Sequence, residues 1–206
     1  MSSSSPQDDL PPRKLKLSDI ADLRAYERTR DEFRSEIITL KKRRRIGVGL
    51  FVTLLFENRE TILFQVQEMA RAENILSDEG ITTELNVYNP LIPLPGTLSA
   101  TLFLELTSED QLREWLPKLV GIQRSLLFRF AGHEVRCVVD EDHEAQLTRD
   151  DVTASVHYIR FEFSPEQVAD WASGPVELVV DHPDYLEVTA LSEATVAELA
   201  TDLAAD

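Results

Sequence analysis

The chain has 206 residues but only one cysteine, Cys137, so it cannot form an internal disulfide or a metal cage of several thiolates. Such cysteine usage fits a reducing cytosol, and we expect a cytoplasmic protein. The apolar run at residues 46–56 is far shorter than the roughly 20 residues that span a bilayer. The opening MSSSSPQDDLPP lacks the basic and apolar regions of a secretion signal. We therefore expect no membrane association.

Positive charge is also scarce. The chain carries 21 Lys and Arg against 37 Asp and Glu, a net charge of −16. General affinity for nucleic acids rests on a positive surface, so this composition argues against a nucleic-acid partner. The imbalance is uneven, because residues 1–45 carry 12 basic and 8 acidic side chains whereas residues 46–206 carry 9 and 29. This uneven charge suits docking of residues 1–45, the N-terminal arm, on residues 46–206 of the same chain or on an acidic partner.

Familiar catalytic motifs are missing as well. The sequence has no phosphate loop, dinucleotide fingerprint, GxSxG elbow or HExxH pair. Cys137 alternates with Val135 and Val139 on an expected strand face, which is typical of a small core residue and not of a nucleophile. The absence of these motifs therefore leaves open whether the protein is an enzyme.

The densest positive charge lies directly before the apolar residues 46–56. Ser18 and the helical spacing of the apolar residues after it predict a helix from Asp19 to about Leu40. Its C-terminus would favour nearby cations, because the helix dipole is negative there. Residues 50–56 are typical of a strand buried on both faces. Five consecutive residues form this basic cluster: Lys41, Lys42, Arg43, Arg44 and Arg45.

Residues 60–76 favour a helix over a strand, because QVQEMARAE contains mostly good helix formers. At 100° per residue, Glu73 falls between Ile62 and Val66 on the apolar face of this helix. A carboxylate there must be paired, protonated or bound to a ligand, because an unpaired buried charge is costly. Our first interpretation is a salt bridge from Glu73 to one of the arginines at residues 43–45.

An octapeptide pattern occurs twice, as SEDQLREW at residues 108–115 and SPEQVADW at residues 164–171. Each copy has a serine N-cap and a glutamine at the third helical position, which is the capping-box pattern. We predict an α+β fold with an antiparallel sheet and packed helices. Residues 97–140 and 153–190 would be related strand-helix-strand-strand units. Residues 1–17 are expected to form a disordered leader, and residues 18–206 a single domain whose N-terminal helices and central strand occupy residues 18–96.

Three histidines are candidate metal ligands. His133 and His182 occupy corresponding turns of the two units, and His157 lies on a strand face with core residues. Imidazole is the commonest ligand of a divalent metal, and Glu68 and Glu73 supply carboxylates on the preceding helix. The alternative is that His133 and His182 are turn residues and His157 is a hydrogen-bonded core residue.

Several separated motifs carry a resemblance to a known family. They are KKRRRIGVGLFVTLLFENRETILFQVQEMARAE, YNPLIP, GHEVR, ASVHYIRFEF and DHPDY. From about Leu17 to Leu191 the chain resembles the uncharacterised bacterial and archaeal family called domain of unknown function 3501 (DUF3501). The resemblance implies a genomic context, because genes of this family often lie beside rubrerythrin-like diiron proteins and iron–sulfur oxidoreductases. The chain itself lacks the paired ExxH motifs and the cysteines of such proteins.

Three functions are compatible with this sequence. The first is a non-catalytic accessory or partner of such a redox system, which docks through the basic cluster and a polar face with Arg59, Glu68 and Arg71. The second is a metal-binding protein or metal-dependent enzyme that uses the histidines and glutamates. The third is a small-anion or nucleotide binder at the basic cluster and the backbone of Gly47 and Gly49.

Overall fold

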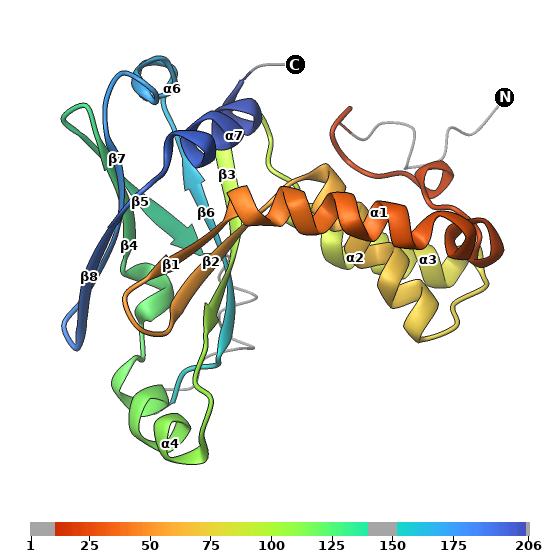
Figure 1. The fold of residues 1–206 in the computed structure, drawn as a ribbon, viewed down its shortest axis with the longest axis horizontal. Helices are drawn as coiled ribbons and strands as arrows, with labels where there is room; N and C mark the ends of the chain where they lie inside the picture. The colour runs from red at the N-terminus through yellow and green to blue at the C-terminus, as the bar shows by residue number, and fades with distance from the viewer. Residues whose placement is uncertain (1–10, 140–151, 205–206) are drawn as a thin grey trace, which may run out of the picture. The chain divides into compact units, whose positions relative to one another are not determined.

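The computed structural model describes residues 11–139 and 152–204, and the contacts within it divide the chain into two compact units. The first unit comprises the described residues up to Lys42 together with Glu57–Pro93. The second comprises Arg43–Phe56 and the described residues from Leu94 onward. The first unit is helical, whereas the second holds the sheet (Figure 1).

The first helix of the first unit begins later and ends later than predicted. It starts at Leu23 and not at Asp19, because the carboxylate of Asp22 accepts the backbone N–H groups of Arg24 and Ala25, each at 3.0 Å. It also continues through the basic cluster to Arg44. The elements of this unit are η1 (Leu17–Asp19), α1 (Leu23–Arg44), α2 (Arg59–Ala72), α3 (Asp78–Tyr88) and η2 (Asn89–Leu91).

The helix predicted at residues 60–76 is confirmed as a helix, but its end is wrong. The side chain of Asn58 caps it by accepting the N–H of Thr61 at 3.0 Å, and it stops at Ala72 because Asn74 adopts a left-handed backbone with φ of 53°. A separate helix, α3, follows and was not predicted. The Ser77 hydroxyl accepts the N–H of Gly80 at 3.2 Å as its N-cap.

Part of the predicted leader contacts the first unit. Leu15 is fully buried, and the Lys14 ammonium donates to the backbone carbonyls of Asn89 and Ile92, each at 2.7 Å. Residues 1–10 of the predicted leader lie outside the described residues. Among the described residues, no helix combines the length and the apolar character needed to cross a membrane.

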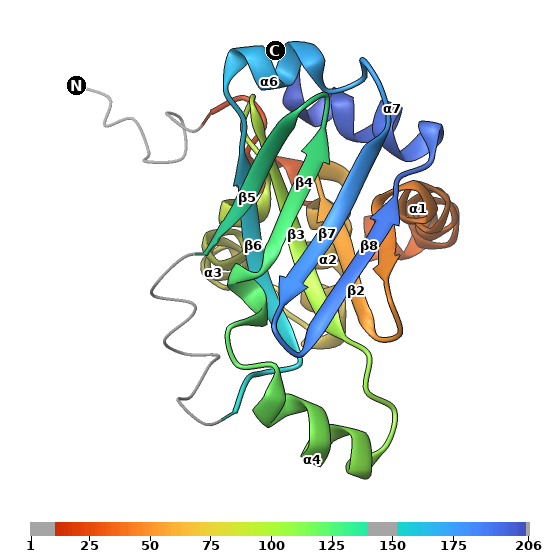
Figure 2. The ribbon, with the colours of Figure 1, turned by 90° about the vertical axis from the view of Figure 1, so that its left-hand side faces the viewer.

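The second unit confirms the predicted α+β class and the antiparallel sheet. Eight strands follow the order β1-β2-β3-β6-β5-β4-β7-β8. Short helices flank the sheet (Figure 2). The strands are β1 (Arg45–Val48), β2 (Val52–Glu57), β3 (Thr97–Leu104), β4 (Leu126–Phe130), β5 (His133–Val139), β6 (Val156–Glu162), β7 (Val176–His182) and β8 (Tyr185–Ala190). The helices are α4 (Glu109–Lys118), η3 (Ile122–Arg124), α6 (Pro165–Asp170) and α7 (Glu193–Leu203).

The apolar segment after the basic cluster forms a hairpin instead of one strand. The buried strand predicted at residues 50–56 begins only at Val52, because Leu50 lies in the turn and is 89 % exposed. Every position of β2 is buried, and β1 pairs with it so that Ile46 lies opposite Leu54. Gly49 lies in the turn with φ of 70°, where a Cβ would approach the Tyr185 hydroxyl to 2.3 Å. Both the backbone conformation and the close approach therefore require glycine at this position.

The two octapeptides form the predicted caps. Ser108 accepts the N–H of Gln111, and Ser164 accepts the N–H of Gln167, each at 3.2 Å. Each helix lies within a strand-helix-strand-strand succession, but β6 inserts between β3 and β5. The strands of the two segments thus interleave and do not form adjacent halves. The duplication stays a prediction, and residue 140 of its first unit lies outside the described residues.

The ends of the sheet approach each other, so that the sheet is nearly closed. The Tyr185 hydroxyl on β8 donates to the carbonyl of Val48 on β1 at 2.7 Å. The Thr189 hydroxyl, also on β8, donates to the carbonyl of Gly47 at 3.0 Å. Side chains of the last strand therefore satisfy backbone acceptors that β1 offers at the other edge of the sheet.

Candidate functional site

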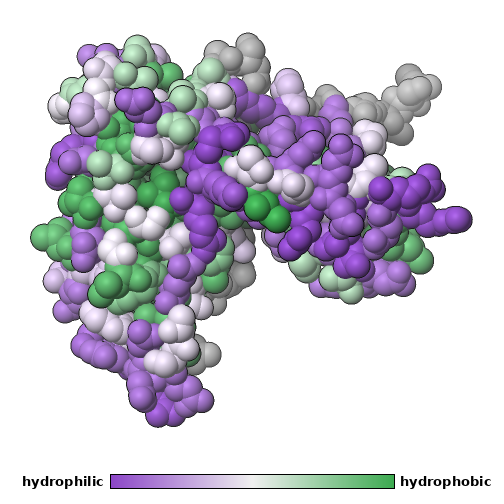
Figure 3. All heavy atoms as spheres, viewed as in Figure 1, coloured by the Kyte–Doolittle hydropathy of each residue, from purple (hydrophilic) through white to green (hydrophobic). Residues whose placement is uncertain are grey.

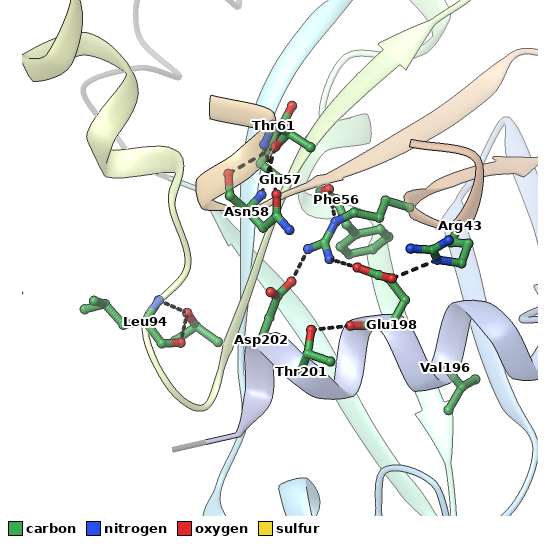
Figure 4. Close-up of polar contacts among 12 residues, drawn as sticks. Arg43, Phe56, Glu57, Asn58, Thr61, Leu94, Val196, Glu198, Thr201 and Asp202 are labelled. Atoms are coloured by element: carbon green, nitrogen blue, oxygen red, sulfur yellow. Dashed lines mark hydrogen bonds and ion pairs between the residues drawn. The ribbon is translucent and has the colours of Figure 1, made fainter. Parts of the chain in front are cut away.

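Arg44, in the basic cluster, is fully buried, with an exposed fraction of 0 %. Its Nε donates to the carbonyl of Phe56 at 2.9 Å, and its Nη1 donates to Oε1 of Glu198 at 2.9 Å. Its Nη2 donates to the carboxylate of Asp202. The guanidinium is thus neutralised by two carboxylates of α7, which are one helical turn apart and point toward it (Figure 4).

The neighbouring arginines of the cluster are also paired within the second unit. Arg43 donates through Nε to Oε2 of Glu198 at 2.8 Å, so that one glutamate bridges two arginines. Arg45 pairs with Glu105. A small anion at these arginines would have to displace carboxylates that already satisfy them. This arrangement is that of an internal charge network.

The two lysines of the cluster differ from the arginines. Lys41 lies over the ring of Phe64, with 5.6 Å from Nζ to the ring centroid, in a cation–π contact within the first unit. Lys42 is exposed and makes no ion pair with a described residue. The five cations therefore do not act as one surface patch.

The carboxylates that hold Arg44 were missed by the sequence analysis, because α7 was not predicted. The sequence nevertheless contains a signal for this helix. Ser192 is a serine N-cap, and Val196, Leu199 and Leu203 recur at helical spacing after it. Glu198 and Asp202 flank that apolar stripe, which is where partners of a buried cation can lie.

Glu68 holds α1 and α2 together in the first unit. Its carboxylate accepts from Nε and Nη2 of Arg30, each at 2.8 Å, and from the Tyr26 hydroxyl at 2.7 Å. The Arg30 guanidinium, with the Tyr26 hydroxyl as a second donor, lowers the pKa of Glu68 to about 2. Burial, followed by the Glu68 carboxylate, raises the pKa of Tyr26. The carboxylate that we predicted as a metal ligand is therefore already bound by three protein donors.

This pairing predicts an acid-sensitive contribution of Glu68 to stability. The pKa of Glu68 is lower in the folded state than its ordinary value of 4.5, so the contribution is complete above that pH and is lost as the pH falls toward about 2. We expect Glu68→Gln to have a lower melting temperature than wild type at neutral pH, and the difference to shrink over that acid range. Circular dichroism melts across the range measure this difference.

A matched control for this measurement is Glu36→Gln on the exposed side of α1, which should change the melting temperature little at any pH. A gap between wild type and Glu68→Gln that stays constant through the acid range would contradict the role given to the ionised carboxylate.

The other members of the predicted docking face are paired as well. Arg59 lies 2.9 Å from the carboxylate of Asp19, and Arg71 donates to the carboxylate of Glu27. Arg59, Arg71 and Glu68 therefore hold α2 against η1 and α1 within the first unit. Their charged groups are engaged in packing.

Glu73 does not lie where the sequence placed it. It is the exposed C-cap of α2, so the predicted burial is wrong, because the helix ends before this residue. The arginines that we expected to pair with it use Glu198, Asp202 and Glu105. Burial and, second, the charge of Glu73 raise the pKa of Glu84. Glu73 thus acts as an exposed surface charge.

Two of the candidate histidines are buried among backbone acceptors. His157 donates through Nε2 to the carbonyl of Ala154 at 2.9 Å, and the Thr153 hydroxyl lies at the same distance from Nε2. His182 donates through Nε2 to the carbonyl of Val120 at 3.0 Å, while its Nδ1 accepts the N–H of Asp184 at 3.2 Å. Both ring nitrogens of His182 are therefore occupied by the protein.

His133, the third candidate, links the β4–β5 hairpin to α6. Its Nε2 lies 2.9 Å from the carboxylate of Asp170. In the part of the chain that the structure describes, no three His, Cys, Asp or Glu side chains gather as a metal site would need. The described geometry brings none of the predicted ligands together in such a group.

Cys137 is a buried core residue, as its alternation predicted. Its Sγ donates to the carbonyl of Gln123 at 3.2 Å, and burial raises the pKa of the thiol to about 11. A thiol in this state is a poor nucleophile near neutral pH.

The described residues line a cavity in each unit. That of the second unit measures about 600 Å³ and lies between the loop at residues 172–175 and the start of α7, with a mostly apolar lining and Glu193 at its side. That of the first unit measures about 170 Å³ beside η1 and the start of α3. Neither cavity is lined by a residue that the sequence predicted as a site.

By its fold, the chain is an α+β protein with a nearly closed antiparallel sheet and a helical unit in which Arg30, Arg59 and Arg71 form internal ion pairs. It belongs to the family described as protein of unknown function (DUF3501), whose family model matches residues 14–203. The chain is also similar to a novel protein of unknown function from Burkholderia pseudomallei K96243, known from a crystal structure. The two are 35 % identical with a TM-score of 0.84, over 93 % of this chain and 100 % of the other. A comparison with curated proteins finds no match.

Proposed function

We propose that this chain is a non-catalytic partner protein that docks on an acidic protein surface through α1. The observation that carries the proposal is a set of exposed cations on this helix that are left over when internal ion pairs are assigned. Arg24, Arg28, Arg34 and Lys42 are exposed and make no ion pair with a described residue, and the proposal uses Arg24, Arg28 and Lys42.

These three cations share one face of α1. Arg24 and Arg28 are one turn apart, and Lys42 returns to the same angular position about five turns beyond Arg24, roughly 27 Å along the axis. Asp31 also lies on this face, and its carboxylate is 3.9 Å from Nη1 of Arg30. The basic face is therefore long and narrow, and the helix around it is strongly hydrophilic (Figure 3).

An apolar anchor lies within this basic face. Ile38 is one turn before Lys42, on the same side of α1, and is 44 % exposed. A single apolar side chain framed by cations is a common arrangement in docking surfaces, since burial of the apolar group supplies affinity and the charges supply orientation. A net charge of −16 disfavours polyanions in general, so a locally acidic protein surface suits this face better than nucleic acid.

The family resemblance supports our choice of partner. Genes of the family often lie beside rubrerythrin-like diiron proteins and iron–sulfur oxidoreductases, so an accessory role in such a redox system is the function that we propose. The metal-binding and anion-binding alternatives have less support, because most of their candidate residues, such as His182, Arg43 and Arg44, are held by protein partners.

Charge reversal on α1 tests the proposal. We expect the triple variant Arg24→Glu, Arg28→Glu, Lys42→Glu to bind the purified rubrerythrin-like or iron–sulfur neighbour about tenfold more weakly than wild type or worse. Binding of wild type should weaken between about 50 mM and about 300 mM salt, because exposed charges are screened. Biolayer interferometry with the immobilised full chain measures both effects.

The matched control reverses three exposed cations of the second unit, Arg113→Glu, Lys118→Glu and Arg160→Glu, with the same change in net charge. This control should bind like wild type. Absence of wild-type binding to either class of neighbour, or an equal loss in the control, would overturn the proposal.

A further inference from the structure

The outer face of the sheet at its β8 edge is apolar where a solvent-facing strand is usually polar. Side chains on β8 alternate, with Tyr185 buried toward the core and Leu186, Val188 and Ala190 facing outward. Leu186 is 72 % exposed and Val188 is 48 % exposed. Outward positions of an antiparallel sheet ordinarily carry polar residues, so this strand inverts the usual pattern.

The register places Val188 opposite Val179 on β7, and Val179 opposite Leu127 on β4. Val179 and Leu127 are themselves buried, so the exposed apolar stripe is formed by Leu186 and Val188 on β8. We call the outward side of β5, β4, β7 and β8 the outer face. None of the helices drawn for the second unit lies in front of these strands (Figure 2).

The charges of this face are balanced. Arg129 lies 3.1 Å from the carboxylate of Glu134 and 3.7 Å from that of Glu177, and Arg136 pairs with Asp181. Two arginines therefore stand among three carboxylates on the face, whereas the chain as a whole has a net charge of −16. The outer face is thus close to neutral and carries both signs beside an exposed apolar stripe.

We propose that the outer face binds a second copy of this chain across a two-fold axis. Two copies with this net charge repel each other through much of their surface, and the nearly neutral outer face adds little to that repulsion. A two-fold interface must be complementary to itself, and a charged patch meets this condition only when it carries both signs of charge. Arg136 of one copy can face Asp181 of the other while Leu186 and Val188 are buried between them.

This self-association goes beyond the docking proposed for α1 and uses residues of the second unit alone. The apolar stripe is small, so we expect a dimer that dissociates at micromolar concentrations. Sedimentation velocity on the full chain, from about 1 to about 500 µM, should show conversion from the monomer of 23.4 kDa to a dimer.

Two variants distinguish the loss of an apolar contact on the outer face from a general effect of added negative charge on dimerisation. Leu186→Asp should weaken dimerisation at least about tenfold, because a carboxylate replaces the apolar contact. Leu76→Asp changes a residue of similar exposure in the first unit and adds the same charge, and it should dimerise like wild type. Circular dichroism melts confirm that both variants are folded.

A charge exchange tests the pairing across the axis. Arg136→Glu alone and Asp181→Arg alone should each weaken the dimer, whereas the double variant carries both signs again and should recover it. A wild-type chain that stays monomeric over the whole range, or a dimer that is equally stable with Leu186→Asp, would overturn the proposal. A different protein bound at this face in place of a second copy would overturn it too.

Discussion

Replacing Arg44 by methionine is expected to lower the free energy of unfolding by about 3–5 kcal/mol. The methionine keeps an apolar stem of similar length but leaves the carboxylates of Glu198 and Asp202 and the carbonyl of Phe56 without their guanidinium. Removing one partner of a buried ion pair costs more than the pair itself contributes, because the remaining charges stay in a poorly solvated place. Urea unfolding followed by circular dichroism measures the change.

Arg43→Met is the matched control. Arg43 bonds to the same Glu198, but its side chain is 43 % exposed, so its loss should cost no more than about 1 kcal/mol. The combined variant Arg44→Met, Glu198→Gln, Asp202→Leu should regain part of the stability that Arg44→Met loses, because the orphaned charges are removed. A cost of Arg44→Met no larger than that of Arg43→Met would refute the buried network.

Trp171→Ala is expected to cost a similar amount, about 3–5 kcal/mol, by opening a cavity in the aromatic core of the second unit. The indole is nearly fully buried, and its ring centroid lies 5.1 Å from that of Phe128, 5.2 Å from that of Phe130 and 5.5 Å from that of Phe163. Its Nε1 also donates to the carbonyl of Val196 at 3.0 Å, so the residue joins α6 to α7. Chemical unfolding followed by far-ultraviolet circular dichroism gives the value.

Two further variants control this measurement. Trp171→Phe keeps most of the apolar volume and should cost less than the alanine variant, with the loss of the Val196 hydrogen bond contributing about 1 kcal/mol. Trp115, at the corresponding position of the other octapeptide, is only partly buried and contacts Phe51 and Tyr185. Trp115→Ala should therefore be milder, and an equal cost would show that burial does not separate the two positions.

Local signals predicted the local structure well. The serine and glutamine of each octapeptide form the expected caps, and residues 52–56 of the strand predicted at residues 50–56 are buried in β2. Such features depend on residues only a few positions apart, so a single sequence contains what is needed to find them. The α+β class follows from the same patterns, because alternating strands and capped helices limit the layers that can pack.

The predicted helix boundaries are wrong where a single polar residue starts or ends a helix within a longer apolar pattern. Asp22 caps α1 four residues after the serine that we expected to start it, and Asn74 ends α2 before Glu73 can reach the apolar face. The prediction for Glu73 continued the helical rotation of 100° per residue beyond the end of α2. A residue beyond the end of a helix does not belong to any face of that helix. Side chains that accept backbone N–H groups can therefore outweigh apolar periodicity at a boundary.

The candidate site depended on distant parts of the chain. Arg43 and Arg44 find Glu198 at separations of 155 and 154 residues, which no local pattern encodes. The histidines lie on the strands or turns that the sequence indicated, yet the interleaving of β6 between β3 and β5 depends on long-range pairing. The topology of the fold, and not the local sequence, therefore determines which carboxylates neutralise the arginines of the basic cluster.

The long separation between Arg44 and its carboxylates sets an order of events during synthesis. Asp202 lies 158 residues after Arg44, so at about 5–20 residues per second a ribosome needs roughly 8–30 s to supply it. During that interval the guanidinium of the nascent chain has to remain hydrated, because neither carboxylate of α7 yet exists. Closure of this part of the second unit therefore cannot precede the synthesis of α7, and a chain released before α7 is made would expose a site that a quality-control protease can recognise.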